Sequence, residues 1–225
     1  MQFKKLGEVL RLRRSYNYSA FSAARNWSNA ELRKFSHQLP GTIVNVSAWE
    51  DKDKEGGYYR DYFSKSTEYF LTNFGTSQGQ LQGAQNEFFL DLEDVPRNLD
   101  RRFDVVFNHT TLEHIYDFRT AFKNLCSLSS DMVVVVVPWL QPLHSDYGDY
   151  WRFSPQAVIK MFDENDMETI HLTWNSNRRS SVYVLAVASR EPAKWKHLFP
   201  NAPIPSSSPE FRILPKVPPG SLAFT

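Results

Sequence analysis

The sequence predicts an α/β fold built on one seven-stranded, mostly parallel sheet whose last strand is antiparallel. Two observations predict it. The middle of the chain has a buried-type strand at 103–107, a helix-period segment at 116–128 and an uninterrupted apolar strand at 132–138. Two later apolar segments, 167–174 and 181–189, are joined by a short turn-rich connection, which makes them antiparallel neighbours.

The amino-terminal residues 1–39 are predicted to form a basic, helical cover over one end of the sheet, with a lid or a dimer contact as the alternative. Helical spacing of apolar residues indicates a first helix at 3–13. A capping-box pattern at 28–31 indicates that a second helix follows at 30–37.

The first three strands of the sheet are predicted at 42–47, 68–72 and 86–90, because these segments are rich in β-branched and aromatic residues. The region 75–85, rich in Gly and Gln, lacks helical periodicity and is predicted to be a loop or a degenerate helix.

The carboxyl-terminal part of the chain begins with a helix whose N-cap and first-turn residues are Ser154 and Pro155. Prolines accumulate from residue 191 and prevent long regular elements. We therefore expect one domain over 1–190, with its core sheet at 41–190, followed by a Pro-rich arm at 191–225.

Composition excludes several classes of function. The net charge of +1 provides no field for nucleic acid, and no apolar run approaches the roughly 20 residues of a membrane span. The single cysteine, Cys126, excludes an intramolecular disulfide and is expected to be a packed thiol. No metal motif accompanies the histidines, so we expect no metal site, and we expect a cytoplasmic protein.

The loop after the first predicted strand, residues 48–63, is unusual because its glycines come late and charges fill the turn. It is either a solvated loop or a remodelled ligand loop in which Tyr58, Tyr59 and Arg60 face a cleft. The sequence leaves both open.

Two motifs resemble the class I S-adenosylmethionine-dependent methyltransferases. The stretch FDVVF at 103–107 with LEHI at 112–115 resembles the fourth-strand signature of these enzymes. Pro138, His144 and the run 149–155 (DYWRFSP) resemble the "P…H…DYYRFTP" stretch of one branch. The resemblance covers about residues 41–190 and implies a Rossmann-like methyltransferase fold with S-adenosylmethionine as cofactor. The usual "DVGCGTG" loop is replaced by NVSAWE at 45–50.

The resemblance also implies where the cofactor binds. The loop after the first strand would meet the methionyl group, Asn73 the ribose and Asp91 the adenine, although Asp91 could instead be a helix cap or a turn residue. The implied cofactor-binding residues are Ser47, Ala48, Trp49, Asn73, Asp91, Leu92, Asn108, His109 and Thr110.

Catalysis of methyl transfer to a hydroxyl requires positioning and a general base. His144 is the first candidate base, and His114 and Asp149 are the next. Glu113 and His114 could instead hold the loop, and Arg152 could pair with Asp149 or Asp146 instead of binding substrate. The candidate substrate-binding residues are Tyr59, Arg60, Tyr147, Tyr150 and Arg152.

The function these residues predict is an S-adenosylmethionine-dependent O-methyltransferase acting on a small-molecule or glycan hydroxyl. By resemblance, it would serve polysaccharide or secondary-metabolite biosynthesis. The alternative is a non-catalytic binding or scaffold protein of the same fold. Partners other than the acceptor are not indicated, and the sequence leaves a homo-oligomer open.

Overall fold

The sheet confirms the predicted α/β fold. The structure, a computed structural model, describes residues 19–75, 80–94, 103–145, 148–176 and 181–200. Within these residues seven strands form one sheet in the order β3-β2-β1-β4-β5-β7-β6, and every neighbouring pair is parallel except the two that β7 makes. The strands are β1 (Gly41–Val46), β2 (Ser66–Asn73), β3 (Glu87–Phe89), β4 (Phe103–His109), β5 (Ser129–Leu140), β6 (Glu168–Trp174) and β7 (Val182–Ser189).

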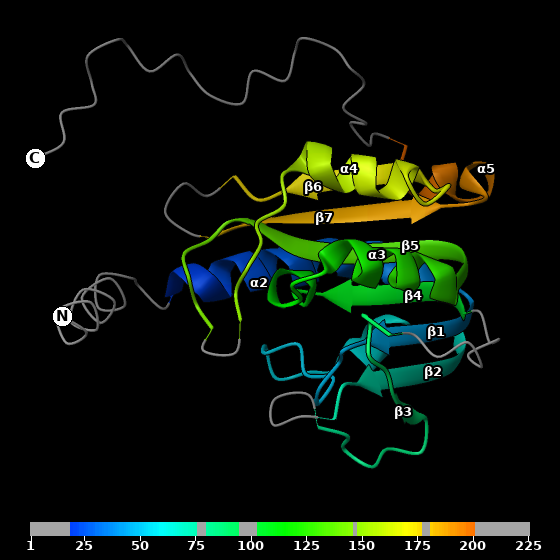
Figure 1. Ribbon diagram of the computed structural model, residues 1–225. Helices are drawn as coiled ribbons and strands as arrows, with labels where there is room; N and C mark the ends of the chain where they lie inside the picture. Colours follow the sequence, from blue (N-terminus) through cyan, green and yellow to red (C-terminus); the bar gives the residue numbers. More distant parts are fainter. Residues whose placement is uncertain (1–18, 76–79, 95–102, 146–147, 177–180, 201–225) are drawn as a thin grey trace, which may run out of the picture.

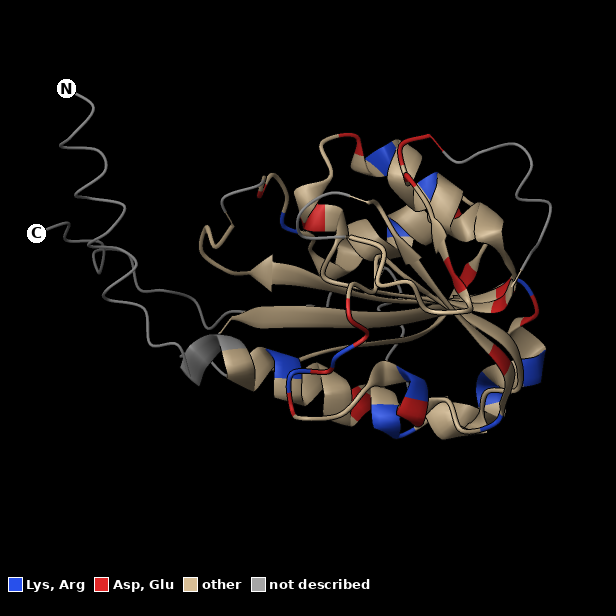
Figure 2. Ribbon diagram, turned by 90° about the horizontal axis from the view of Figure 1, so that it is seen from below, with Lys and Arg blue, Asp and Glu red and all other residues tan. Residues whose placement is uncertain are grey.

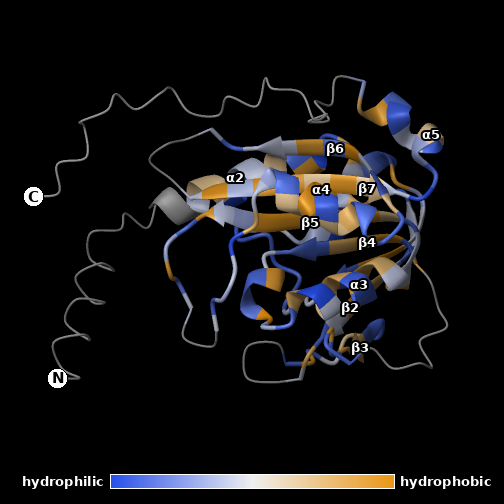
Figure 3. Ribbon diagram, turned by 45° about the horizontal axis from the view of Figure 1, so that its top comes forward, coloured by the Kyte–Doolittle hydropathy of each residue, from blue (hydrophilic) through white to orange (hydrophobic). Residues whose placement is uncertain are grey.

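Helices cover both faces of the sheet (Figures 1 and 2). On one face α3 (Phe118–Leu128) and α4 (Pro155–Asp163) pack over the sheet, and on the other α2 (Ser19–Arg33) and the short η2 (Tyr59–Tyr62) do so. The sheet thus separates two apolar cores. Apolar residues concentrate on its central strands (Figure 3), and all eight residues of β7 are buried. No helix among the described residues has the length and apolar character to cross a membrane.

Both helices on the first face form close to the predicted positions, and α4 starts at its predicted cap. Asp117 accepts a hydrogen bond from Thr120 N (3.2 Å) at the start of α3, and Ser154 accepts one from Ala157 N (3.2 Å) at the start of α4. Cys126 of α3 is buried in the core, as predicted, and burial raises the pKa of its thiol to about 12.

The amino-terminal prediction is wrong in its second helix. Helix α2 spans Ser19–Arg33, so the pattern at 28–31 lies inside a helix and does not start one. Ser28 Oγ donates to the carbonyl of Arg25 (2.8 Å) and lies 2.9 Å from His109 Nε2, because this side chain turns inward. Tertiary contacts therefore override the local capping signal. The helix predicted at 3–13 lies outside the described residues.

Strand β5 is longer than predicted at both ends. Pro138 does not end it but pairs with Tyr183 of β7, and the register shifts between Pro138 and Leu140. The carbonyl of Pro138 also accepts the N–H of Phe153 (2.8 Å), which ties the loop after β5 to the strand.

The described chain continues past residue 190 in two short helices, α5 (Pro192–Trp195) and η4 (Lys196–Leu198). Trp195 is buried, and its Nε1–H donates to Asp131 at the start of β5 (2.8 Å). Lys194 and Ser189 also donate to this carboxylate. The beginning of the predicted Pro-rich arm therefore packs on the sheet.

Candidate active site

The carboxyl ends of β1, β2 and β4 point to the same side in Figure 1, so their loops share one edge with the loop after β5. In open α/β sheets ligands bind at this edge. The candidate residues fall into two groups there, one after β1 and β2 and one after β4 and β5.

The loop after β1 makes a sharp turn without glycine. Ser47, Trp49 and Asp51 have positive φ values of 58°, 49° and 60°. The amides predicted to face the methionyl group bond to β2 instead: Ser47 N donates to Thr72 Oγ1 (3.1 Å) and Ala48 N to Thr72 O (3.0 Å). These hydrogen bonds compensate for the strain of positive φ values that glycines would adopt without strain.

Asn73, the predicted ribose contact, is fully buried and clamps this loop. Its Oδ1 accepts from Trp49 N (2.6 Å), and its Nδ2 donates to Trp49 O (3.1 Å) and to Glu87 Oε1 (2.5 Å). Burial alone would raise the pKa of Glu87, but hydrogen bonds from Gln82 N, Asn73 and Ala84 N hold it below its ordinary value. Glu87 was not among the predicted site residues, because no motif marks the first residue of β3.

Buried carboxylates hold the rest of the loop. Asp51 accepts from Asn45 Nδ2 (2.9 Å), Tyr69 OH (2.9 Å) and Arg60 Nε (2.8 Å). Arg60, a predicted substrate contact, is therefore engaged within the loop. The Asp51 carboxylate is buried, whereas the Arg60 side chain stays 48% exposed.

Tyr59 does not face a cleft, contrary to the prediction. It is only 4% exposed and belongs to the core under α2, where its hydroxyl donates to Asn29 Oδ1 (3.0 Å) and accepts from Arg25 Nη1 (3.1 Å). The helical turn η2 explains this, because it turns Tyr59 toward the sheet. The neighbouring Tyr58 stays 43% exposed.

Asp91 and Leu92 follow β3. Asp91 Oδ1 accepts from Glu93 N (2.9 Å), which is the turn geometry that the sequence left open as an alternative. Leu92 is buried in the core, and its carbonyl accepts from Asn124 of α3 (2.8 Å). The turn uses Oδ1 of Asp91 and not its second carboxylate oxygen.

The tip of β4 is a buried polar network. Asn108 Nδ2 donates to Val46 O (2.9 Å), while Thr110, with φ of 49°, accepts from Arg25 Nη2 (3.0 Å). Burial holds the pKa of His109 well below its ordinary value, and the nearby charge of Arg25 acts in the same direction. Arg25 comes from α2 and was not among the predicted residues, because only the fold brings it to β4.

The loop after β5 is organised by Asp149. This carboxylate accepts from His144 Nδ1 (3.1 Å) and from both terminal nitrogens of Arg152 (2.5 and 2.8 Å). Arg152 also donates to the carbonyls of Gln141 (2.7 Å) and Pro142 (3.0 Å). Arg152 therefore staples the loop, which is the alternative that the sequence left open.

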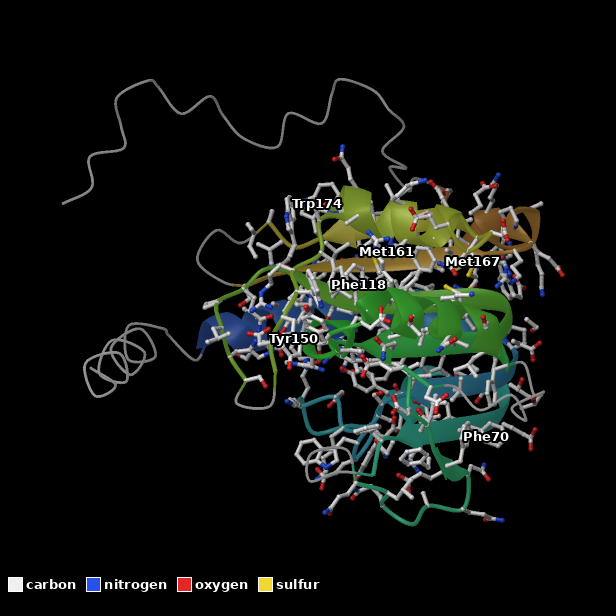
Figure 4. The ribbon with its side chains drawn as sticks, in the orientation of Figure 1. Phe70, Phe118, Tyr150, Met161, Met167 and Trp174 are labelled. Carbon is white, nitrogen blue, oxygen red and sulfur yellow. The ribbon has the colours of Figure 1, made fainter. Side chains whose placement is uncertain are left out.

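Two aromatic substrate candidates belong to the same loop. Tyr150 is 52% exposed at this edge (Figure 4), and its ring lies 5.4 Å from that of Tyr116 in a perpendicular arrangement. Tyr147 lies outside the described residues.

Glu113 and His114 of η3 (Leu112–His114) complete the second group. His114 Nδ1 donates to Gly148 O (2.5 Å), and its Nε2 lies 3.7 Å from Glu113 Oε1. The rings of His114 and His144 are 5.1 Å apart. Burial raises the pKa of Glu113 to about 8 and lowers the pKa of both histidines. The fold thus brings the three predicted catalytic residues, His114, His144 and Asp149, together.

No family model matches the chain, and no curated protein matches it either. Solved structures do match. Magnesium protoporphyrin IX methyltransferase from Synechocystis PCC 6803, with bound S-adenosylmethionine, aligns with a TM-score of 0.51 at 11% identity, over 74% of this chain and 79% of its own. The chain has the class I methyltransferase fold.

Two further structures with this fold show how far the likeness extends. The 1,6-didemethyltoxoflavin-N1-methyltransferase of Burkholderia thailandensis aligns with a TM-score of 0.53 at 12% identity, over 83% of this chain and 89% of its own. The N-methyltransferase NodS of Bradyrhizobium japonicum WM9 aligns with a TM-score of 0.53 at 11% identity, over 73% of this chain and 86% of its own. Both were crystallised with S-adenosylhomocysteine. At such identities the likeness establishes the methyltransferase fold and leaves the substrate to be inferred from the site.

Proposed function

We propose that the protein is an S-adenosylmethionine-dependent methyltransferase that transfers a methyl group to a hydroxyl of a small molecule or glycan. One observation carries this. At the ligand-binding edge of a methyltransferase fold, the loops after β4 and β5 bring His114 and His144 within 5.1 Å, and Asp149 holds the second of them.

A hydroxyl acceptor must lose its proton as the methyl group arrives, and a neutral imidazole can take it. Burial lowers the pKa of His144, which favours the neutral ring at pH 7. Because Nδ1 of His144 donates to Asp149, the lone pair of the neutral ring lies on Nε2, where the proton would be accepted. The Asp149 carboxylate would then stabilise the imidazolium that forms.

Tyr150 and Tyr116 extend from this point into solvent, where two exposed rings suit the apolar faces of a sugar or a flat acceptor. They support a glycan or a secondary metabolite as the acceptor.

In this proposal, residues after β1 and β3 would hold the adenosyl part of S-adenosylmethionine. Trp49 exposes 44% of its surface and can stack on a base, and Asp91 can accept from an amino group. The cofactor supplies an electrophilic methyl group when bound. The chain's part is to hold the acceptor, exclude water and take the proton.

A second candidate function is a non-catalytic binding protein of the same fold. It is favoured by the amides of Ser47, Ala48 and Trp49, which already bond to β2 and Asn73. In that case the loop after β1 would hold no methionyl group.

Calorimetry with S-adenosylmethionine and S-adenosylhomocysteine separates the two. The enzyme should bind both, and Asp91→Ala should weaken binding by about 1–3 kcal/mol. His144→Ala should lower turnover of an acceptor while cofactor affinity stays unchanged, and His37→Ala, an exposed control, should alter neither. Absence of cofactor binding at millimolar ligand would refute the methyltransferase proposal.

A further inference from the structure

We propose that Glu113, His114 and His144 form a binding site for a divalent transition-metal ion, with Zn²⁺ as the ion that best matches the three ligands. Two imidazoles and one carboxylate are the ligands of a common type of catalytic zinc site. The sequence predicted no metal, because the ligands come from two loops about thirty residues apart and form no motif.

The three side chains converge. One ligand atom from each lies within 4.8 Å of the other two, and His114 Nε2 is 3.7 Å from Glu113 Oε1. Ligand atoms around tetrahedral zinc, at bond lengths of about 2.1 Å, are roughly 3.4 Å apart. Binding would therefore draw the ligands together by on the order of 1 Å, which side-chain rotation can supply.

The carboxylate of Glu113 is the independent sign of a ligand. The residue is 0% exposed, and neither carboxylate oxygen has a hydrogen-bond partner among the described residues. Buried polar groups are almost always paired, because an unpaired one costs free energy. The backbone around it is fixed, since the carbonyl of Glu113 accepts from Tyr150 N (2.7 Å). A bound cation would give these oxygens their partner.

Both histidines are oriented for metal binding. His114 Nδ1 donates to Gly148 O and His144 Nδ1 to Asp149, so each neutral ring carries its lone pair on Nε2. Such contacts fix the tautomer of a ligating histidine. The two nearby guanidinium groups are already engaged, Arg152 by Asp149 and Arg25 by Tyr59 and Thr110.

Three protein ligands leave a coordination position open, as in catalytic zinc sites. If the proposed function holds, an acceptor hydroxyl bound there would lose its proton to solvent more readily, because the metal stabilises the oxyanion. In that case the metal would promote loss of the proton, and His144 would act as a metal ligand and not as a base. The binding site itself does not depend on that function.

The test is calorimetric titration of the untagged, chelator-stripped full chain with ZnCl₂. We expect one zinc per chain, with affinity reduced at least about 10- to 100-fold in Glu113→Gln and in His144→Gln. His37→Gln, at an exposed histidine, is the matched control and should bind like the unaltered protein. Far-UV circular dichroism checks that each variant is folded, and His144→Gln decides if Glu113→Gln does not fold.

The proposal is overturned if the unaltered chain takes up no stoichiometric zinc, or if folded Glu113→Gln and His144→Gln both bind as the control does. Cobalt substitution gives a second readout, since its visible spectrum should change when a ligand is removed. Zinc binding without S-adenosylmethionine binding would support the metal site and refute the proposed methyltransferase function. Binding of S-adenosylmethionine without binding of zinc would refute only the metal site.

Discussion

Asn73 allows a sharp test of how the loop after β1 is held. The substitution Asn73→Asp replaces the side-chain amide with a carboxylate of nearly the same shape. In this structure the change should destabilise the fold. A carboxylate keeps the acceptor for Trp49 N but loses both donors, and it stands beside Glu87, whose Oε1 lies 2.5 Å from Asn73 Nδ2.

The expected magnitude is set by the two hydrogen bonds that the substitution removes. The bond to Trp49 O contributes about 1 kcal/mol and the charge-assisted bond to Glu87 about 1.5–3 kcal/mol. Repulsion between the two carboxylates adds to this until one takes up a proton. We therefore expect the free energy of unfolding to fall by about 3–5 kcal/mol at pH 7.

Urea unfolding followed by circular dichroism measures this, with Asn86→Asp, at an exposed asparagine of the same region, as the control. The double variant Asn73→Asp/Glu87→Gln should recover at least about 1 kcal/mol. The Gln amide can donate to the new carboxylate, while its carbonyl keeps the bonds from Gln82 N and Ala84 N. If Asn73→Asp destabilises the protein equally with and without Glu87→Gln, the contact between Asn73 and Glu87 does not help to hold the loop after β1.

Three further predictions concern the second group of residues and the buried network. Arg152→Leu should lower the free energy of unfolding by about 3–5 kcal/mol, because it removes the cation that pairs with the buried carboxylate of Asp149. In the same urea assay Arg119→Leu, which breaks an exposed ion pair, should cost at most about 1 kcal/mol. An effect of Arg152→Leu on substrate affinity alone would contradict the role of Arg152 in holding the loop. His109 stays neutral in the fold while the unfolded chain binds a proton below about pH 6.5, so stability should fall as pH drops through that value, by up to about 1.4 kcal/mol per pH unit. His109→Gln should make the slope of unfolding free energy against pH shallower, and an unchanged slope would argue against a buried neutral ring. Gly148→Ala should destabilise the protein more than Gly56→Ala. Both glycines have a positive φ, of +115° and +99°, but a Cβ on Gly148 would lie only 2.7 Å from the ring of Tyr150, whereas one on Gly56 would meet open space. Equal thermal midpoints of the two variants would contradict this.

The sheet could be predicted because long apolar strands and a short final connection leave few topologies. The bounds of helix α2 could not be predicted, because Ser28 and Asn29 resemble a helix start in the local sequence. Their contacts with β4 and with the loop after β1, which bury them inside the helix, come from distant parts of the chain. The edge that carries the candidate site was predicted from the rule that ligands meet the carboxyl ends of parallel strands.

What each polar side chain does there could not be predicted from the sequence. Asn73 and Arg152 look like ligand contacts in a sequence and are engaged by the protein itself. Glu113 looks structural beside His114, yet both of its buried carboxylate oxygens lack a hydrogen-bond partner among the described residues. Hydrogen-bond partners distant in sequence decide these roles, and no spacing rule reports them.

The contacts of Asp131 determine where the chain can be shortened. A protein cut after Arg190 would lose the indole and ammonium donors of Trp195 and Lys194 and leave this carboxylate facing water at the edge opposite the site. One cut after Phe199, whose ring stacks on that of His171 at 4.8 Å, would keep both. Crystallisation trials and domain fusions should therefore place the new carboxyl terminus beyond Phe199, where the edge with the candidate site is left unaltered.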